Sequence, residues 1–213
     1  MPILDFHTHR TDAPDALISV SPRHFDPQPD RWYSVGYHPW DDVDTLTNDD
    51  FALLEQCARH PQVLAIGETG IDRLRGATLD IQTASFVRHL QLAADLGKPV
   101  VIHCVRAAQE ILTARRQAGL TAVPMAIHGM RANANVASIL LNAGCYLSFG
   151  PRFNPDALRI TPLDRLLIET DDSPSTITIN EVAALVATTL HLPTEEITKI
   201  ATNNAHRLLN YSQ

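Results

Sequence analysis

The sequence predicts an α/β protein built as a (β/α)8 barrel of the TIM type, distorted and without its first crossover helix. Short apolar runs alternate with longer amphipathic segments, and eight such runs lie near residues 3, 17, 33, 64, 100, 125, 146 and 166. No Gly-x-Gly-x-x-Gly motif follows the first run, which disfavours the alternative of an open, doubly wound dinucleotide-binding sheet. Neither a linker nor a repeat divides the 213 residues, so we expect a single barrel domain over residues 1–213.

The first part of the chain is expected to contain four strands and one helix. The strands are 3–9, 16–20, 32–37 and 63–66, and the helix is 49–60. Only six residues separate His9 from Ala16, whereas a crossover helix needs about a dozen, so the first helix is expected to be missing. Pro61 ends the helix because proline cannot continue the helical hydrogen-bond pattern.

From residue 79 onward, helices and strands are expected to alternate. The helices are 79–96, 107–118, 133–143, 180–190 and 194–210, and the strands are 99–102, 125–127, 145–148 and 166–168. Gly97, Gly119 and Gly144 follow the first three of these helices, where glycine commonly ends a helix. Because strands joined through helices run parallel, this alternation indicates a parallel sheet.

Composition limits the classes of function. The chain has 45% hydrophobic residues but no apolar run of about 20, the length that spans a bilayer, and no basic segment precedes its first apolar run. Its three cysteines share no Cys-x-x-Cys spacing, which favours a reducing cytoplasm. The net charge of −7 argues against broad adhesion to nucleic acid, although all but two of the 17 basic residues are arginine, a good partner for phosphate.

Potential metal ligands cluster where the predicted strands end: His7, His9, His38, Glu68, His103, His128 and Asp171. In a barrel these ends meet at one rim, where barrel enzymes carry their active sites. Imidazoles and carboxylates together suit two divalent ions of the Zn²⁺ or Mn²⁺ type better than Mg²⁺, which stays a candidate. Two such ions about 3.5–4 Å apart need a bridging group. The two lysines, Lys98 and Lys199, follow no strand, which leaves Glu68 as the expected bridge.

The same segments resemble, in order, the signatures of the TatD-like metal-dependent deoxyribonucleases. They are Asp5-Phe6-His7-Thr8-His9, Val35-Gly36-Tyr37-His38-Pro39, Ala65-Ile66-Gly67-Glu68-Thr69-Gly70-Ile71-Asp72, Gly97-Lys98-Pro99-Val100-Val101-Ile102-His103-Cys104, Leu167-Ile168-Glu169-Thr170-Asp171 and Asn203-Asn204-Ala205. The resemblance implies a first ion on His7, His9, Glu68 and Asp171 and a second on Glu68, His103 and His128. It also implies that His38 lies on the substrate side.

Several loops depart from the family pattern. The segment after His128 reads Gly129-Met130-Arg131, where the family usually has Cys-Phe-Ser-Gly, and the loop after Asp171 is short. These departures leave the metal ligands in place and shorten the segments expected to hold the substrate. The candidate phosphate-binding arginines are Arg10, Arg73 and Arg106.

The expected function is hydrolysis of phosphoester bonds by a water that two divalent ions activate. Asp171, Glu68 and His38 are the expected catalytic residues, with Asp171 orienting the water and accepting its proton. The expected partner is DNA or a small phosphoester, without a membrane. An amidohydrolase-like enzyme acting on a small ester or amide is the alternative, and a metal-binding protein without catalysis is a third. The sequence leaves the oligomeric state, the preference for DNA or RNA and the cleavage polarity open.

Overall fold

A computed structural model describes residues 2–41, 43–174 and 176–210. Its strands are β1 Asp5–Thr8, β2 Ala16–Val20, β3 Trp32–Val35, β4 Val63–Asp72, β5 Val100–Val105, β6 Met125–Ile127, β7 Tyr146–Phe149 and β8 Leu166–Ile168. They pair in chain order and close into a barrel, and the registered pairs are parallel. The predicted (β/α)8 fold class is therefore confirmed.

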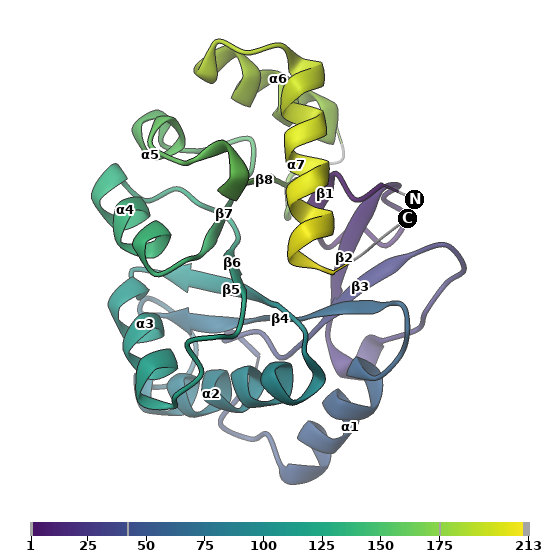
Figure 1. The fold of residues 1–213 in the computed structure, drawn as a ribbon. Coiled ribbons are helices and arrows are strands. Elements are labelled where there is room, and N and C mark those ends of the chain that lie inside the picture. Colours follow the sequence, from purple (N-terminus) through teal and green to yellow (C-terminus); the bar gives the residue numbers. More distant parts are fainter. Residues whose placement is uncertain (1, 42, 175, 211–213) are drawn as a thin grey trace. The chain divides into compact units, whose positions relative to one another are not determined.

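The helices follow the strands in the order that the sequence predicts (Figure 1). They are α1 Asn48–Ala58, α2 Leu79–Leu96, α3 Ala108–Gln117, α4 Ala134–Asn142, α5 Pro155–Arg159, α6 Ile179–Leu190 and α7 Thr194–Leu208. Two single 3-10 turns, Pro22–His24 and Leu163–Arg165, complete the set within the described residues. The five-residue helix α5, which begins at the Asn154 cap, was not predicted because it is too short for a helical period to show.

The chain forms two compact units. The central unit comprises Ser19–Ala126, and the terminal unit comprises Met1–Ile18 with Ile127–Gln213. The expectation of one domain over residues 1–213 stays a prediction, and each unit is described by itself below.

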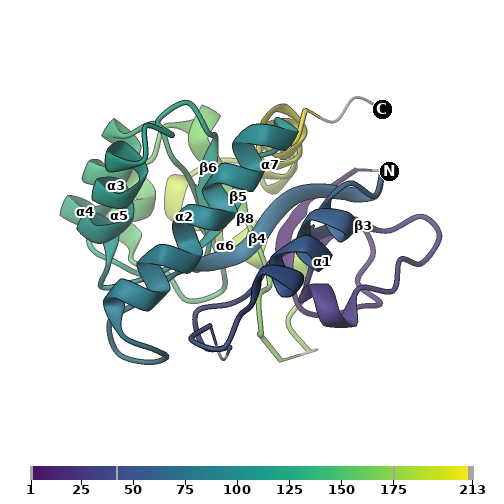
Figure 2. The same cartoon turned by 90° about the horizontal axis from the view of Figure 1, so that it is seen from below.

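In the central unit, β4 and β5 are the longest paired strands, and α2 packs along β4 (Figure 2). Both strands extend further than predicted, because their pairing continues to Asp72 opposite Val105 with a register shift after Ile66. Glu68 and His103 therefore lie within strands and do not follow them. The register shift contains Gly67, at a φ of 134°. A Cβ at Gly67 would lie 2.4 Å from the Val101 carbonyl oxygen, so only glycine fits there.

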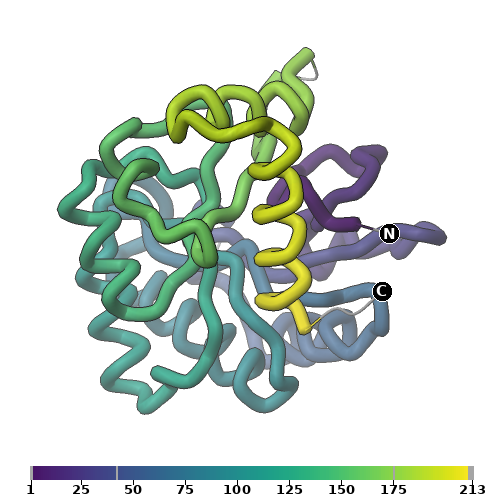
Figure 3. The backbone as a smooth tube through the Cα atoms, turned by 45° about the horizontal axis from the view of Figure 1, so that its top comes forward, coloured from purple at the N-terminus to yellow at the C-terminus, as the bar shows by residue number. Residues whose placement is uncertain are grey.

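In the terminal unit, β1 pairs with β8 through Asp5 and Ile168, and α7 packs on β8 beside α6 (Figure 1). Residues 9–15, all described, contain no helix, and the purple segment in Figure 3 passes from β1 to β2 through a loop. The missing first helix is thus confirmed. At the other end of the chain, Asn204 of α7 donates from Nδ2 to the carbonyls of Leu163 and Leu166, at 2.7 and 2.8 Å.

Capping boxes define the starts of α1 and α6. Thr47 and Asp50 form the box of α1, and Thr178 and Glu181 form that of α6. Each box satisfies backbone N–H groups that the first helical turn leaves without a carbonyl partner. Helix α7 begins at Thr194, as predicted, but its cap residue is Pro193 and no side chain caps it.

The buried side chains are mainly aliphatic and come from the strands and from the inner faces of the helices. Examples with no exposed surface are Ile66, Ile102 and Leu90 in the central unit and Phe149 and Val186 in the terminal unit. Within the described residues, each helix is too short or too polar to cross a bilayer.

Candidate functional site

Three of the predicted site residues meet in the central unit, and we call them the central cluster: His38, Glu68 and His103. Glu68 Oε1 lies 2.9 Å from His38 Nε2 and 2.8 Å from His103 Nδ1. The two ring nitrogens are themselves 3.1 Å apart. Because β4 and β5 pair side by side, Glu68 and His103 reach the same place from neighbouring strands. One carboxylate oxygen thus lies between two imidazoles, all of them buried or half-buried.

Asp72 at the end of β4 orients His103 from the other side of the ring. Its Oδ2 lies 3.3 Å from His103 Nε2 and accepts the Trp40 indole N–H at 2.7 Å. Burial raises the pKa of Asp72, but hydrogen bonds from the Leu74 N–H, Trp40 and His103 outweigh it and hold the pKa below its usual value. An ionised Asp72 favours a proton on His103 Nε2, which leaves Nδ1 as the nitrogen available for a metal. Asp72 and Trp40 are site residues that sequence reasoning missed, although Asp72 closes a recognised motif.

His38 is held in place through its neighbour Tyr37. The Tyr37 N–H donates to Nε2 of His89, a fully buried residue of α2, at 3.0 Å. His89 Nδ1 lies 2.8 Å from the Ser85 carbonyl, to which it donates. Burial lowers the pKa of His89 to about 4. The neutral ring therefore fixes the backbone that carries His38 with one nitrogen as acceptor and the other as donor.

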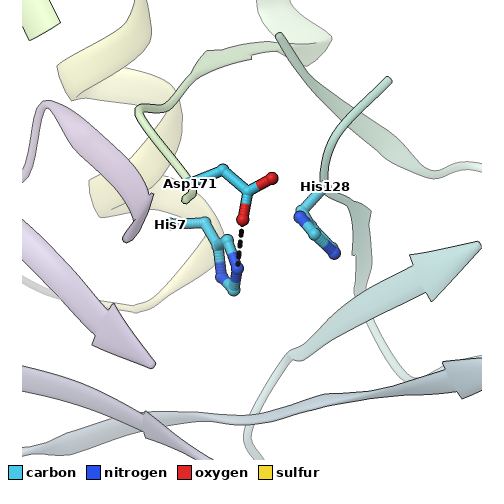
Figure 4. Close-up of side chains that lie close together, drawn as sticks. All are labelled: His7, His128 and Asp171. Atoms are coloured by element: carbon cyan, nitrogen blue, oxygen red, sulfur yellow. Dashed lines mark ion pairs between the residues drawn. The ribbon is translucent and has the colours of Figure 1, made fainter. Parts of the chain in front are cut away.

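In the terminal unit, His7, His9, His128 and Asp171 form a second group, the terminal cluster. Asp171 Oδ1 lies 3.6 Å from His7 Nε2 and 3.8 Å from His9 Nε2. The ring centroids of His7 and His128 are 4.2 Å apart, and Figure 4 shows both rings next to the Asp171 carboxylate. The Asp171 N–H donates to the His7 carbonyl at 2.9 Å, which continues the pairing of β1 with β8 beyond the strands.

Two fully or nearly buried carboxylates lie behind the terminal cluster. Glu169 Oε1 accepts the Gly129 N–H at 2.5 Å and lies 3.7 Å from His128 Nδ1. Asp5 accepts from the backbone N–H and the hydroxyl of Thr170, at 2.8 and 2.6 Å. Burial raises the pKa of Asp5 to about 7, against the lowering effect of the Thr170 hydrogen bonds. Both residues lie in the motifs that resemble the family, but nothing in those motifs marks them as part of the site.

The donor atoms of both clusters fit divalent transition-metal ions. His38, Glu68 and His103 form one group whose ligand atoms lie within 4.8 Å of one another, and His7, His128 and Asp171 form another. Ligand atoms each about 2.1 Å from one tetrahedral ion are about 3.4 Å from one another, close to the distances in both groups. The expectation that Glu68 also serves the terminal cluster joins the two units and stays a prediction.

The chain matches the family described as TatD related DNase over residues 25–210. It belongs to that family. It is 32% identical over 196 residues to the uncharacterized metal-dependent hydrolase YabD of Bacillus subtilis, covering 82% of this chain and 76% of that protein. It is 33% identical over 150 residues to the 3'-5' ssDNA/RNA exonuclease TatD of Musicola paradisiaca, covering 66% of this chain and 56% of the relative.

Solved structures share the fold of this TatD family member. The TatD homologue YjjV of Escherichia coli superposes with a TM-score of 0.76 at 19% identity, over 98% of both chains. The family match and the metal-dependent hydrolase relatives confirm the predicted assignment as a TatD-type metal-dependent hydrolase and favour it over the amidohydrolase-like alternative. The assigned metal and catalytic residues stay predictions.

The three predicted phosphate-binding arginines have different surroundings. Arg10 donates from Nη1 to the Ile177 carbonyl at 3.2 Å, and Arg73 forms an ion pair with Glu110. Arg106 is exposed at a φ of 51°. A fourth arginine, Arg131, was not predicted, yet its Nη2 lies 3.8 Å from Asp171 Oδ2. It occupies the segment in which the chain departs from the family pattern.

Proposed function

We propose that this protein hydrolyses phosphodiester bonds of nucleic acid, with two divalent metal ions held by the central and terminal clusters. The main support for this proposal is the geometry of the central cluster in a chain of the TatD family. Glu68 Oε1 lies 2.9 Å from His38 Nε2 and 2.8 Å from His103 Nδ1. The named relatives include exonucleases that act on single-stranded DNA and RNA, which supports a nucleic acid as the substrate.

His38, His103 and Glu68 would hold one ion, and His7, His9, His128 and Asp171 would hold the other. This proposal differs from the ligand set that the family resemblance implies, in which His128 binds with Glu68 and His103 and His38 lies on the substrate side. Ions bound there would lower the pKa of a coordinated water toward about 7 and would offset the charge of the phosphate. We infer that Zn²⁺ or Mn²⁺ occupies these sites, because imidazole nitrogens make up most of the donors. The cytoplasm stays the expected compartment, on the cysteine pattern of the sequence.

Side chains around the two clusters would orient the attacking water, the metal ligands and the phosphate. Asp171 Oδ1 lies near both His7 and His9, where a carboxylate can orient the attacking water and accept its proton. Asp72 keeps the Nε2 proton of His103, so that Nδ1 faces Glu68. The exposed guanidinium of Arg131, close to Asp171, is placed to contact a phosphate oxygen.

A hydrolysis assay tests this function. Purified protein is stripped with EDTA and then given Mn²⁺ or Zn²⁺ in the presence of a labelled single-stranded oligonucleotide, with lactone and amide compounds tested in parallel. We expect the stripped protein to be inactive and metal to restore release of nucleotides. Hydrolysis that persists in EDTA would overturn the mechanism. Metal-dependent turnover of a lactone or amide without cleavage of the oligonucleotide would overturn the substrate class.

A further inference from the structure

A pocket of about 370 Å³ opens beside the central cluster in the central unit. Its lining residues are Ser21, Arg23, His24, Tyr37, Trp40, Asp41 and Leu46. No residue of either metal-binding cluster belongs to this set, so the pocket is separate from the proposed ion sites. We call it the Trp40 pocket.

Trp40 connects the pocket to the central cluster. Its ring centroid lies 4.7 Å from that of His38 and 5.2 Å from that of His103, in both cases edge to face. The indole N–H donates to Asp72 Oδ2 at 2.7 Å, and the Trp40 backbone N–H donates to His38 Nδ1 at 3.1 Å. An aromatic ring that lines a pocket is therefore in direct contact with two candidate metal ligands.

The Trp40 ring is held rigid while part of it stays open. The Arg75 guanidinium lies 4.0 Å from the ring centroid, a cation–π contact that covers one part of the indole. Arg75 is not one of the residues that line the pocket, and Trp40 keeps 40% of its surface exposed. A large exposed indole, fixed by an indole hydrogen bond and a stacked guanidinium, is a preorganised surface for a flat ligand.

The remaining lining groups can bind the edge of a polar ring. Arg23 and His24 supply nitrogen donors, and Asp41, whose Oδ2 accepts the His38 N–H at 3.0 Å, supplies acceptor oxygens. Arg23 is paired with Asp50 at 2.8 Å, so its guanidinium is oriented before a ligand binds. A flat ring that carries both donors and acceptors at its edge is the chemistry of a nucleobase.

We propose that the Trp40 pocket is a base subsite, in which the nucleobase next to the scissile phosphate stacks on Trp40. The inference rests on the proposed phosphodiesterase function, since it places the phosphate at the central cluster. Stacking of a base on an aromatic side chain needs an unpaired base, because bases within a duplex already stack on their neighbours. The subsite therefore selects single-stranded nucleic acid.

Tryptophan fluorescence tests the subsite without any hydrolysis. The chain has two tryptophans, Trp32 and Trp40, so Trp32→Phe leaves Trp40 as the only indole. EDTA-treated protein is titrated with a hexamer of thymidylate and with a hexamer of the same backbone that lacks bases. Because stacking is worth about 1–3 kcal/mol per base, we expect the thymidylate hexamer to quench Trp40 and to bind about 5- to 150-fold more tightly than the abasic one.

The complementary chain, Trp40→Phe, keeps only Trp32 and should show no quenching with either hexamer. Equal quenching of Trp40 by both hexamers, or no quenching by either, overturns the base subsite. If Trp32→Phe does not fold, as judged by circular dichroism, quenching in the wild-type chain and its absence in Trp40→Phe give the same answer.

Kinetics separate stacking from support of Asp72. Trp40→Leu removes the ring and the indole donor, whereas Trp40→Phe keeps a ring and removes only the donor. Because both variants lose the hydrogen bond to Asp72, any effect of that bond on the central cluster should be the same for the two hexamers. For a base subsite we expect Trp40→Leu to lower kcat/KM for the thymidylate hexamer about tenfold or more beyond its effect on the abasic hexamer, and Trp40→Phe to affect both hexamers equally. Equal loss on both hexamers in Trp40→Leu overturns the proposal.

Leu74→Ala changes a 64% exposed side chain outside the pocket and keeps the backbone N–H that donates to Asp72, so it is the matched control and should behave as wild type. Absence of hydrolysis of every phosphodiester by the wild-type protein, with each metal, would instead contradict the proposed function. The fluorescence titration still decides the base subsite in that case.

Discussion

The central and terminal clusters contain the same types of ligand but hold them differently. In the central cluster, Glu68 Oε1 is within 2.9 Å of two imidazole nitrogens, which is hydrogen-bonding distance. In the terminal cluster, the corresponding distances from Asp171 Oδ1 to His7 and His9 are 3.6 and 3.8 Å, which is longer than a hydrogen bond. Around a tetrahedral ion the separation is about 3.4 Å, between the two cases.

The spacing of the ligand atoms decides how each cluster responds to an ion. The central cluster is closed by its own hydrogen bonds and has to open slightly, by a few tenths of an ångström, to admit metal. The terminal cluster is already spaced for an ion, and two buried carboxylates, Asp5 and Glu169, lie behind it. We therefore expect the terminal cluster to bind metal more tightly, because less of the binding energy is spent on rearrangement.

Substitution of one carboxylate in each cluster gives the largest expected effect. Glu68→Gln and Asp171→Asn keep the shape of the side chain and remove its charge, and we expect each to lower kcat/KM about 10³-fold, or about 4 kcal/mol of transition-state stabilisation. Metal content, measured by mass spectrometry after dialysis, tests which of the two clusters binds its ion more tightly. The more tightly binding terminal cluster should keep its ion in Glu68→Gln.

Glu55→Gln, a change of a partly exposed glutamate on α1, is the matched control and should retain full activity and metal content. Loss of both ions in Glu68→Gln would contradict the ranking of the clusters. Activity close to wild type in either carboxylate variant would contradict the assigned ligands.

The buried histidine of the central unit gives a pH effect on stability. Burial holds the pKa of His89 at about 4, below its ordinary value of 6.5, so the unfolded chain takes up a proton at a higher pH than the folded protein does. This contribution to the free energy of unfolding is fully present above pH 6.5 and is lost as the pH falls toward 4. The pKa difference corresponds to about 3 kcal/mol.

Urea unfolding between pH 7 and 4 measures this contribution. In His89→Gln, whose amide can still accept from the Tyr37 N–H and donate to the Ser85 carbonyl, the fall in stability should be smaller by about that amount. Parallel curves for the variant and the wild type would show that His89 does not carry the pH dependence.

Substitution of Glu169 tests whether this buried carboxylate orients the ligands of the terminal cluster. Glu169→Gln keeps an acceptor for the Gly129 N–H but removes the charge 3.7 Å from His128 Nδ1. Loss of a carboxylate that orients a histidine ligand typically costs about 10- to 100-fold in metal affinity or activity, and we expect a loss in this range. Titration with Mn²⁺, followed by isothermal calorimetry, measures the affinity directly.

If Glu169→Asp binds Mn²⁺ more tightly than Glu169→Gln, the negative charge at this position orients His128. Glu195→Gln, at an exposed position in the first turn of α7, serves as the control for loss of a charge from the same unit. Unchanged Mn²⁺ affinity in Glu169→Gln would limit Glu169 to a structural contact with Gly129.

Helix caps give the smallest expected effect and the closest comparison of the two units. Thr47→Ala removes the cap of α1 in the central unit, and Thr178→Ala removes that of α6 in the terminal unit. Each should lower the free energy of unfolding by about 1 kcal/mol and Tm by about 2–4 °C, with activity unchanged. Calorimetry of both variants measures the shifts. A change in kcat would show that the cap also positions the site.

Much of the fold is readable from local patterns. The alternation of apolar runs and amphipathic segments predicts the strands and the long helices, because burial of one face imposes a period of 2 or 3.6 on the residues. The pattern failed for α5, which has only five residues, and for the ends of β4 and β5. Those strands continue through glycine and polar residues because neighbouring backbone pairs with them. The sequence of one segment does not show which strand it will pair with.

Local patterns in the sequence were enough to predict the order of the barrel elements, the missing first helix and a set of candidate ligand residues. Each depends on a local property, such as strand length, loop length or the side chain at a strand end. Which side chains meet depends on the folded structure. It brought Asp72 and Trp40 to His103, set Glu169 beside His128, and placed Arg131 near Asp171. Such contacts join residues far apart in the chain, and pairing and packing create them only when the chain folds.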